Sequence, residues 1–221
     1  MPRLFTALEI PSQVAQSLSM MRGGLPGARW IDAENYHLTL RFIGDIDDAL
    51  AHEIAGMLGR VRRMSFQMRL DGLTSFGGRK PRALVAAVAP TAPLMELQAE
   101  HERLLQRLGL EPEGRKYTPH VTLARLRDSS SHQVAEYLSA RGHYRSASFE
   151  VSRFVLFSSR SSVGGGPYVV EADYPLERSP SSAAAGSTPG ERSERWGRNE
   201  DVRPHAGVAS LAGHPRAGEG D

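Results

Sequence analysis

The feature that most constrains this chain is a short strand-like pattern that occurs twice. Residues 37–42 read His-Leu-Thr-Leu-Arg-Phe, and residues 120–125 read His-Val-Thr-Leu-Ala-Arg. In a β-strand, residues two apart project from the same face, so the histidine and the threonine of each copy lie side by side. The apolar residues between them then face a core. Two such copies in one chain predict two equivalent half-sites.

Composition limits the class of protein. The chain has 221 residues, 40% of them hydrophobic, which is enough for one domain or two closely joined lobes. The absence of cysteine excludes a disulfide scaffold, a thiolate metal site and a cysteine nucleophile. No apolar run approaches the roughly 20 residues that span a membrane, and the N-terminus does not read as a signal peptide. We therefore expect a cytoplasmic monomer without a membrane partner.

Apolar periodicity predicts strands and helices that alternate in two comparable runs, each with one H-x-T-L strand. The expected strands cover residues 4–10, 37–45, 66–70, 83–88, 120–125, 149–158 and 168–174. The expected helices cover residues 14–21, 47–60, 92–108 and 130–140. An α+β architecture with helices outside a central pair of sheets accounts for this order.

Three segments are predicted to lie outside these elements. Residues 74–82 form a glycine-rich basic loop, either a solvated turn or a flap that brings Arg79, Lys80 or Arg82 to a substrate phosphate. Gly164-Gly165-Gly166 predicts a hairpin turn, because no Gly-Lys-Ser follows as in a phosphate-binding loop. Residues 179–221 are rich in serine, alanine, glycine, proline and charge, which predicts a disordered tail after a domain of residues 1–178.

The paired histidines and threonines indicate acid–base chemistry. Histidine titrates near neutrality, so one ring can take a proton while the other gives one. Threonine hydroxyls can donate hydrogen bonds to a group whose negative charge grows in the transition state. Phosphodiester cleavage fits this set. Neither strand has a carboxylate beside its histidine and there is no H-E-x-x-H, so we expect no metal and no cofactor.

The chain resembles the two-histidine phosphoesterases and, within them, the bacterial and archaeal RNA 2′,3′-cyclic phosphodiesterases, also called 2′-5′ RNA ligases. The likeness covers roughly residues 3–177 and includes the segments 3–8, 30–44, 118–125 and 168–176. It implies a bilobal fold whose two pseudo-symmetric halves have antiparallel sheets lining a central cleft. It also implies hydrolysis of RNA 2′,3′-cyclic phosphate ends to 2′-phosphates. Reversible 2′-5′ RNA ligation by the reverse reaction is possible in principle, although the sequence contains no nucleotide-activating motif to drive it.

The resemblance also implies roles for individual residues. By position, His37 corresponds to the proton donor and His120 to the proton acceptor, while Thr39 and Thr122 hold the phosphate. The arginine that ends the second motif, Arg125, is a candidate phosphate contact. Arg41 in the first motif is a weaker candidate, since it lies equally well at the sheet surface.

Some positions depart from the family pattern or stay open. Relatives often carry an aromatic residue in the strand at residues 82–88, where this chain has only small and aliphatic side chains after Arg82. A phosphodiesterase of small nucleotide cyclic phosphates and a non-catalytic RNA-binding module are the two alternatives. The remaining histidines of the predicted domain are expected at the surface or its boundary; they are His52, His101, His132 and His143.

Overall fold

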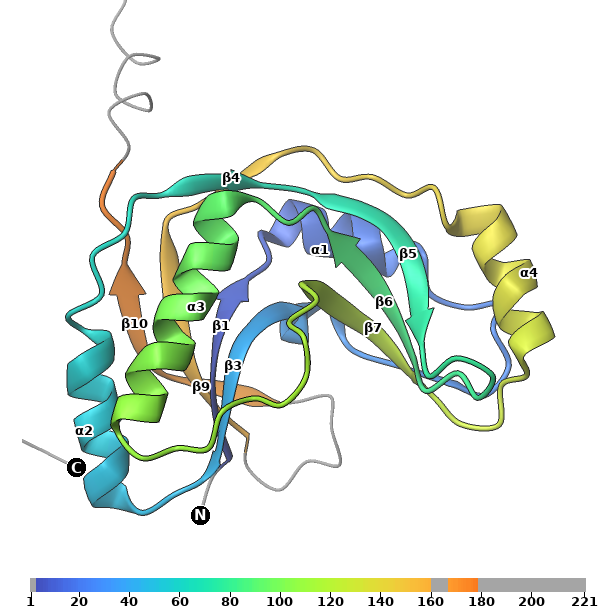
Figure 1. Cartoon of the computed structure of the whole chain (residues 1–221). Coiled ribbons are helices and arrows are strands. Elements are labelled where there is room, and N and C mark those ends of the chain that lie inside the picture. Colours follow the sequence, from blue (N-terminus) through green and yellow to red (C-terminus); the bar gives the residue numbers. More distant parts are fainter. Residues whose placement is uncertain (1–2, 160–166, 179–221) are drawn as a thin grey trace, which may run out of the picture. The chain divides into compact units, whose positions relative to one another are not determined.

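The structure, a computed structural model, describes residues 3–159 and 167–178 (Figure 1). Its strands are β1 (Arg3–Glu9), β2 (Ala28–Trp30), β3 (His37–Asp45), β4 (Phe66–Met68), β5 (Leu70–Phe76), β6 (Ala83–Val88), β7 (His120–Leu126), β8 (Phe149–Val151), β9 (Arg153–Ser159) and β10 (Tyr168–Pro175). Its helices are α1 (Ser12–Ser19), the 3₁₀-helix η1 (Ala33–Asn35), α2 (Asp48–Leu58), α3 (Ala92–Arg107) and α4 (Ser131–Arg141). Within the described ranges, no helix is both long and apolar enough to cross a membrane.

One antiparallel sheet holds both motif strands at its centre. Its order is β10-β9-β1-β3-β7-β6-β5, and β2 lies along β7. The two motif strands β3 and β7 pair only at Leu38 and Val121, which divides the sheet into two halves. A separate two-stranded sheet is formed by β4 and β8. The expected α+β class with antiparallel sheets is therefore confirmed.

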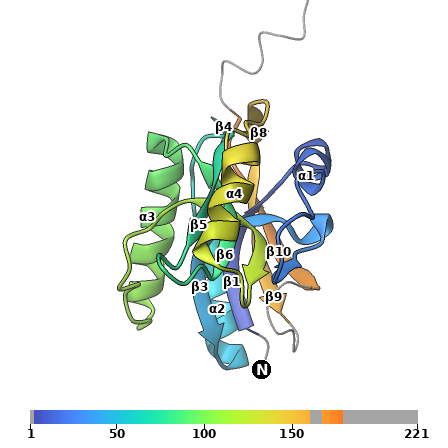
Figure 2. The same cartoon turned by 90° about the vertical axis from the view of Figure 1, so that its right-hand side faces the viewer.

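The helices cover one face of the sheet, and each half has its own. On the half that contains β1 and β3, His101 of α3 forms a hydrogen bond with Thr6 of β1. Helix α2 lies beside α3 (Figure 1). On the other half, Tyr137 of α4 packs against Trp30 of β2, with ring centroids 6.1 Å apart. Figure 1 shows α3 alongside β1, β3 and β9 and α4 beyond β5, and Figure 2 also shows the two helices apart. The halves are thus interleaved along the sequence, whereas the periodicity predicted two consecutive runs.

The glycine-rich loop is shorter than predicted. β5 continues through Phe76, which pairs with Ala83, so residues 74–76 belong to the strand. The chain reverses at residues 77–82, where Gly77 has a φ of 113°. A Cβ on Gly77 would lie 2.3 Å from the Lys80 carbonyl oxygen, so only glycine fits there. The predicted turn at residues 164–166 and the predicted tail lie outside the described residues.

Candidate active site

The two motifs meet at the centre of the sheet, on the face opposite the helices. Leu38 and Val121 pair directly and are fully buried on the helix side. Because side chains alternate along a strand, the residues on either side of this pair project from the other face. His37 and Thr39 therefore share a face with His120 and Thr122. The structure brings the four predicted residues together, and the two rings are near enough to interact electrostatically.

Each histidine is held in the same way by the backbone two residues before it. Nδ1 of His37 lies 2.8 Å from the Asn35 carbonyl oxygen, and Nδ1 of His120 lies 2.7 Å from that of Thr118. A carbonyl oxygen only accepts, so Nδ1 carries the hydrogen in both rings. Nε2 of each ring is then the nitrogen left to exchange a proton with a substrate.

The surroundings of the two rings lower both pKa values. Burial is the main cause for His37 and lowers its pKa from 6.5 to about 4, while the Asn35 carbonyl opposes the shift and His120 and Arg125 add to it. Burial also lowers the pKa of His120, the Thr118 carbonyl opposes this, and Arg125 again adds to it. Both rings are therefore neutral at pH 7 in the free protein.

A one-residue bulge follows the threonine in both motif strands. Along β3, Thr39 pairs with Ala7 and Arg41 with Thr6, which leaves the residue between them unpaired. Along β7, Thr122 pairs with Val85 and the residue two further on pairs with Leu84, so the same position is unpaired. A bulge shifts the alternation of side chains by one. The residue after the unpaired one, Arg41 in β3 and Ala124 in β7, consequently faces the helix side.

The bulges send the two candidate arginines to opposite faces. In β7 the inward residue is Ala124, fully buried, and Arg125 is exposed on the face of the histidines. Its charge acts on the pKa of both rings. In β3 the corresponding positions are Arg41, which is 8% exposed, and Phe42, which is 57% exposed. Arg125 thus belongs to the site, and its counterpart in the first motif is Phe42.

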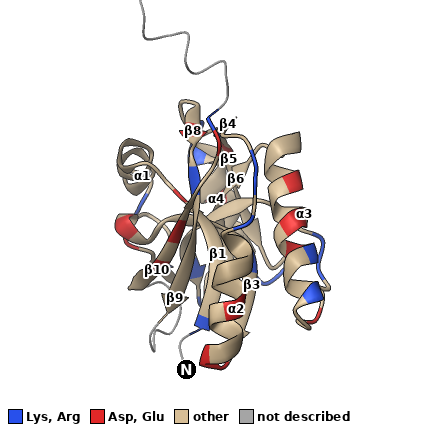
Figure 3. Ribbon diagram, turned by 90° about the vertical axis from the view of Figure 1, so that its left-hand side faces the viewer, with Lys and Arg blue, Asp and Glu red and all other residues tan. Residues whose placement is uncertain are grey.

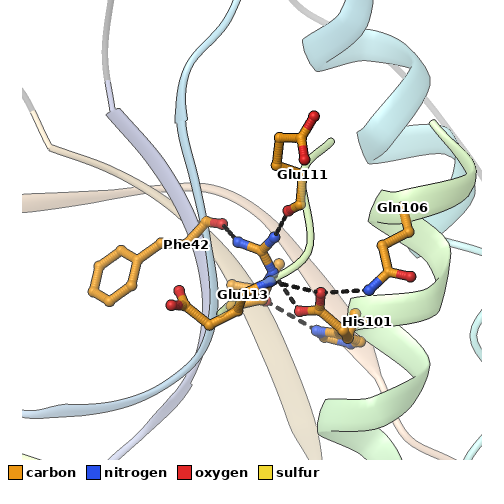
Figure 4. Close-up of polar contacts among 8 residues, drawn as sticks. Phe42, His101, Gln106, Glu111 and Glu113 are labelled. Atoms are coloured by element: carbon orange, nitrogen blue, oxygen red, sulfur yellow. Dashed lines mark hydrogen bonds and ion pairs between the residues drawn. The ribbon is translucent and has the colours of Figure 1, made fainter. Parts of the chain in front are cut away.

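The expectation that Arg41 contacts substrate phosphate does not fit its position. Its Nε lies 2.5 Å from a carboxylate oxygen of Glu102 on α3, and its two Nη atoms donate to the carbonyl oxygens of Phe42 and Glu111 (Figure 4). The other Glu102 oxygen accepts from the Glu113 backbone at 3.0 Å. Arg41 therefore fastens the segment before β7 to the first half of the sheet.

Aromatic rings lie around the two histidines. They come from other strands, so the alternation of side chains along the motif strands did not predict them. Tyr168 lies edge-on to His37 with ring centroids 4.9 Å apart, and Phe5 lies 5.0 Å from it. Phe76 lies edge-on to His120 at 4.7 Å. Phe76 comes from β5, beyond β6, whose residues on this face are small. The aromatic ring beside His120 therefore comes from β5 and not from β6.

His101 is not at the surface, contrary to the expectation for it. It is fully buried in the stripe of α3 that also contains Leu94, Leu97 and Leu104. Its Nδ1 lies 2.9 Å from the Thr6 hydroxyl, and its Nε2 has no partner among the described residues. The helical spacing of these four residues was the signal that would have placed it in the core.

Two hollows lie near the first motif. One of about 180 Å³ adjoins His37 and is lined by Glu9, Ile10, Glu34, Asn35, Tyr36, Phe157, Tyr168 and Val170. A larger one of about 470 Å³ lies between α1 and η1, and its lining contains neither histidine. We place the candidate site at the histidines, because two rings able to exchange protons near neutral pH converge there.

Comparison with known proteins shows the family of this chain. The family model described as LigT like Phosphoesterase matches residues 8–87 and 85–168, and the chain belongs to this family. An RNA 2′,3′-cyclic phosphodiesterase of Aeropyrum pernix is 34% identical over 144 residues, which cover 64% of this chain and 81% of that protein. An RNA 2′,3′-cyclic phosphodiesterase of Aquifex aeolicus is 31% identical over 156 residues, which cover 67% of this chain and 81% of that protein.

Solved structures show a similar fold. The crystal structure of E. coli LigT complexed with 3′-AMP has 26% sequence identity and a TM-score of 0.66, and the match covers 80% of this chain and 99% of that one. The resemblance to two-histidine phosphoesterases and the fold of two similar halves are confirmed. The predicted enzyme class, a phosphoester hydrolase, is confirmed by the family.

Proposed function

We propose that this enzyme hydrolyses 2′,3′-cyclic phosphate ends of RNA to 2′-phosphates. The observation that carries the proposal is the matched pair of histidines on one face, each with Nδ1 held by a backbone carbonyl and Nε2 left free. Two such groups suit a reaction in which one proton is taken and another is given. The names of the two curated relatives support the choice of substrate.

In the proposed reaction water attacks the phosphorus and the bond to the 3′ oxygen breaks. His120 takes the proton of the water, and His37 gives a proton to the departing 3′ oxygen; this order follows the family resemblance. The negative phosphate raises the pKa of a nearby ring, which enables one of two neutral histidines to bind the proton it needs. Thr39, Thr122 and Arg125 stabilise the charge that develops on the phosphoryl oxygens.

The proposed reaction uses no metal ion. The described residues contain no group of three histidine, aspartate or glutamate side chains placed to hold one. Arg125 supplies positive charge at the phosphate in place of a cation. Activity should therefore persist in excess EDTA.

The test uses a short RNA that ends in a 2′,3′-cyclic phosphate, incubated with the protein and EDTA, and identifies the product isomer. The proposal expects a 2′-phosphate and a free 3′ hydroxyl. His52→Ala, a change to an exposed histidine of α2, is the matched control and should be as active as the wild type. A 3′-phosphate product would show that the 2′ oxygen departs and would contradict the assigned leaving group. RNA that binds without turnover would indicate a binding module.

The two histidine roles can be separated with a cyclic end that carries sulfur in place of the 3′ oxygen. A thiolate departs without needing a proton, so the variant lacking the general acid should recover activity on this substrate. The variant lacking the general base should not. If His120→Ala recovered activity on this substrate and His37→Ala did not, His120 would be the general acid and His37 the general base.

A further inference from the structure

A second arginine lies directly beside Arg125 on the catalytic face. In the antiparallel pairing of β2 with β7, Arg29 is opposite Arg125. Its neighbours Ala28 and Trp30 pair with Leu126 and Ala124, which are buried on the helix side. Alternation therefore turns Arg29 to the other face. Residues directly opposite in such a pair have Cβ atoms about 4.5–5.5 Å apart.

The part of the chain that the structure describes does not neutralise this arginine pair. Among residues 3–159 and 167–178, neither guanidinium makes a hydrogen bond or an ion pair. Like charges directly opposite each other destabilise a sheet. Ala83 pairs with Arg125 on its other side, at the start of β6, so the turn with the exposed Arg79 and Lys80 adjoins the same end of the site. An anion bound between the two guanidinium groups would relieve this repulsion.

The opposite end of the site holds two glutamates, and one of them, Glu9, is ion-paired with Arg153 at 2.6 Å. Glu9 pairs directly with His37 across β1 and β3, and together with Glu34 it lines the hollow beside that ring. Carboxylates repel a phosphodiester chain, whereas the Arg29 end attracts it. The unpaired arginines at β2 and β7 therefore attract a polyanionic substrate, whereas the glutamate end does not.

We propose that Arg29 binds the internucleotide phosphodiester next to the reacting cyclic phosphate, so that an oligonucleotide is preferred to a cyclic mononucleotide. The inference rests on the proposed function and adds a second phosphate subsite to it. Arg125 acts on both histidines and therefore serves the reacting phosphate. Arg29 lies on the neighbouring β-strand, β2. In the proposed complex, the next phosphate of the RNA passes there. Guanidinium groups suit phosphate oxygens because they donate in pairs.

The test compares adenosine 2′,3′-cyclic phosphate with the dinucleotide ApA that ends in the same cyclic phosphate. For Arg29→Gln, kcat/KM on the dinucleotide should fall by about 10- to 100-fold, as for loss of a charged hydrogen bond. On the mononucleotide it should not change. Arg29→Lys should recover most of the loss. The matched control is Arg103→Ala on α3, the helix of mixed charge over the other face (Figure 3), which should change neither substrate.

Salt dependence gives an independent readout. Loss of one phosphate contact should make the slope of log kcat/KM against log salt concentration less negative by about 0.7 on the dinucleotide. An equal loss on both substrates, or none on either, would overturn the subsite while leaving the proposed function in place. A wild-type protein that turns over neither substrate would overturn both.

Discussion

At the residue scale, the two histidines are matched in tautomer but differ in how far their pKa values are lowered. One ring must be protonated and the other neutral, and kcat/KM reports the pKa values of the free enzyme. These are about 4 for His37 and below 6.5 for His120. We expect a bell-shaped pH dependence of kcat/KM with its maximum below pH 6.5, whichever ring is the acid. A plateau extending through pH 8 would contradict this.

Arg125 contributes to both limbs of that bell. Its positive charge lowers the pKa of both rings, so its removal raises both. For Arg125→Gln, the whole profile of kcat/KM should move to higher pH while its height falls. A lower profile at an unchanged pH would show that the guanidinium does not act on the rings.

His101 provides a second residue-scale prediction, for stability. Burial lowers its pKa from 6.5 to about 3, so between these pH values the unfolded chain binds a proton that the folded chain does not. The free energy of unfolding should therefore fall as the pH falls from about 6.5, by up to about 1.4 kcal/mol per pH unit from this residue. Urea unfolding at pH 4–7 checks it. His101→Gln should show a shallower dependence, whatever its stability at pH 7; an identical slope would refute the assignment.

At the scale of elements, the bulges explain what the sequence could and could not predict. Strict alternation places Arg41 on the face of His37 and Thr39, and Ala124 on the face of His120. The structure reverses this, because one unpaired residue follows each threonine. A bulge depends on the partner strand, so it leaves no mark in the motif's own sequence. The histidines and threonines precede the bulges, and their convergence was predictable.

The Arg41 contacts belong to the same scale, since they join β3, α3 and the segment before β7. Arg41→Ala should lower the free energy of unfolding by about 3–5 kcal/mol, because it leaves Glu102 without its buried partner. Arg125→Ala should cost less than about 0.5 kcal/mol, as for an exposed residue, yet lower kcat/KM by about 10- to 100-fold. Denaturant unfolding and kinetics on both variants measure this contrast. Similar stability of the two variants would contradict the assigned positions.

At the scale of the whole molecule, all the residues assigned to the site lie between Phe5 and Tyr168. The last described strand pairing joins Glu177 to the segment before β4. We therefore expect a chain ended after residue 178 to keep the kcat/KM and melting temperature of the full chain. A loss of activity in the shorter chain would assign residues 179–221 a part in substrate binding.

The architecture was predictable in class but not in connectivity. The lengths and types of most helices and strands follow from apolar periodicity, as α3 at Ala92–Arg107 illustrates. Each half combines strands that are far apart in the sequence. This arrangement depends on long-range pairing, such as that of Phe5 with Phe157. The aromatic rings around His37 come from β1, β9 and β10, which only this pairing brings together.

The central claim is that the two histidines act together on one phosphoester, and a double-mutant cycle on RNA with a 2′,3′-cyclic phosphate end tests it most directly. His37→Ala and His120→Ala should each lower kcat by about 10²–10⁴-fold. The double variant should be about as slow as the slower single variant, because groups that act as a unit are not additive. Full activity of either single variant, or a double variant whose loss is the product of the two, would contradict the claim.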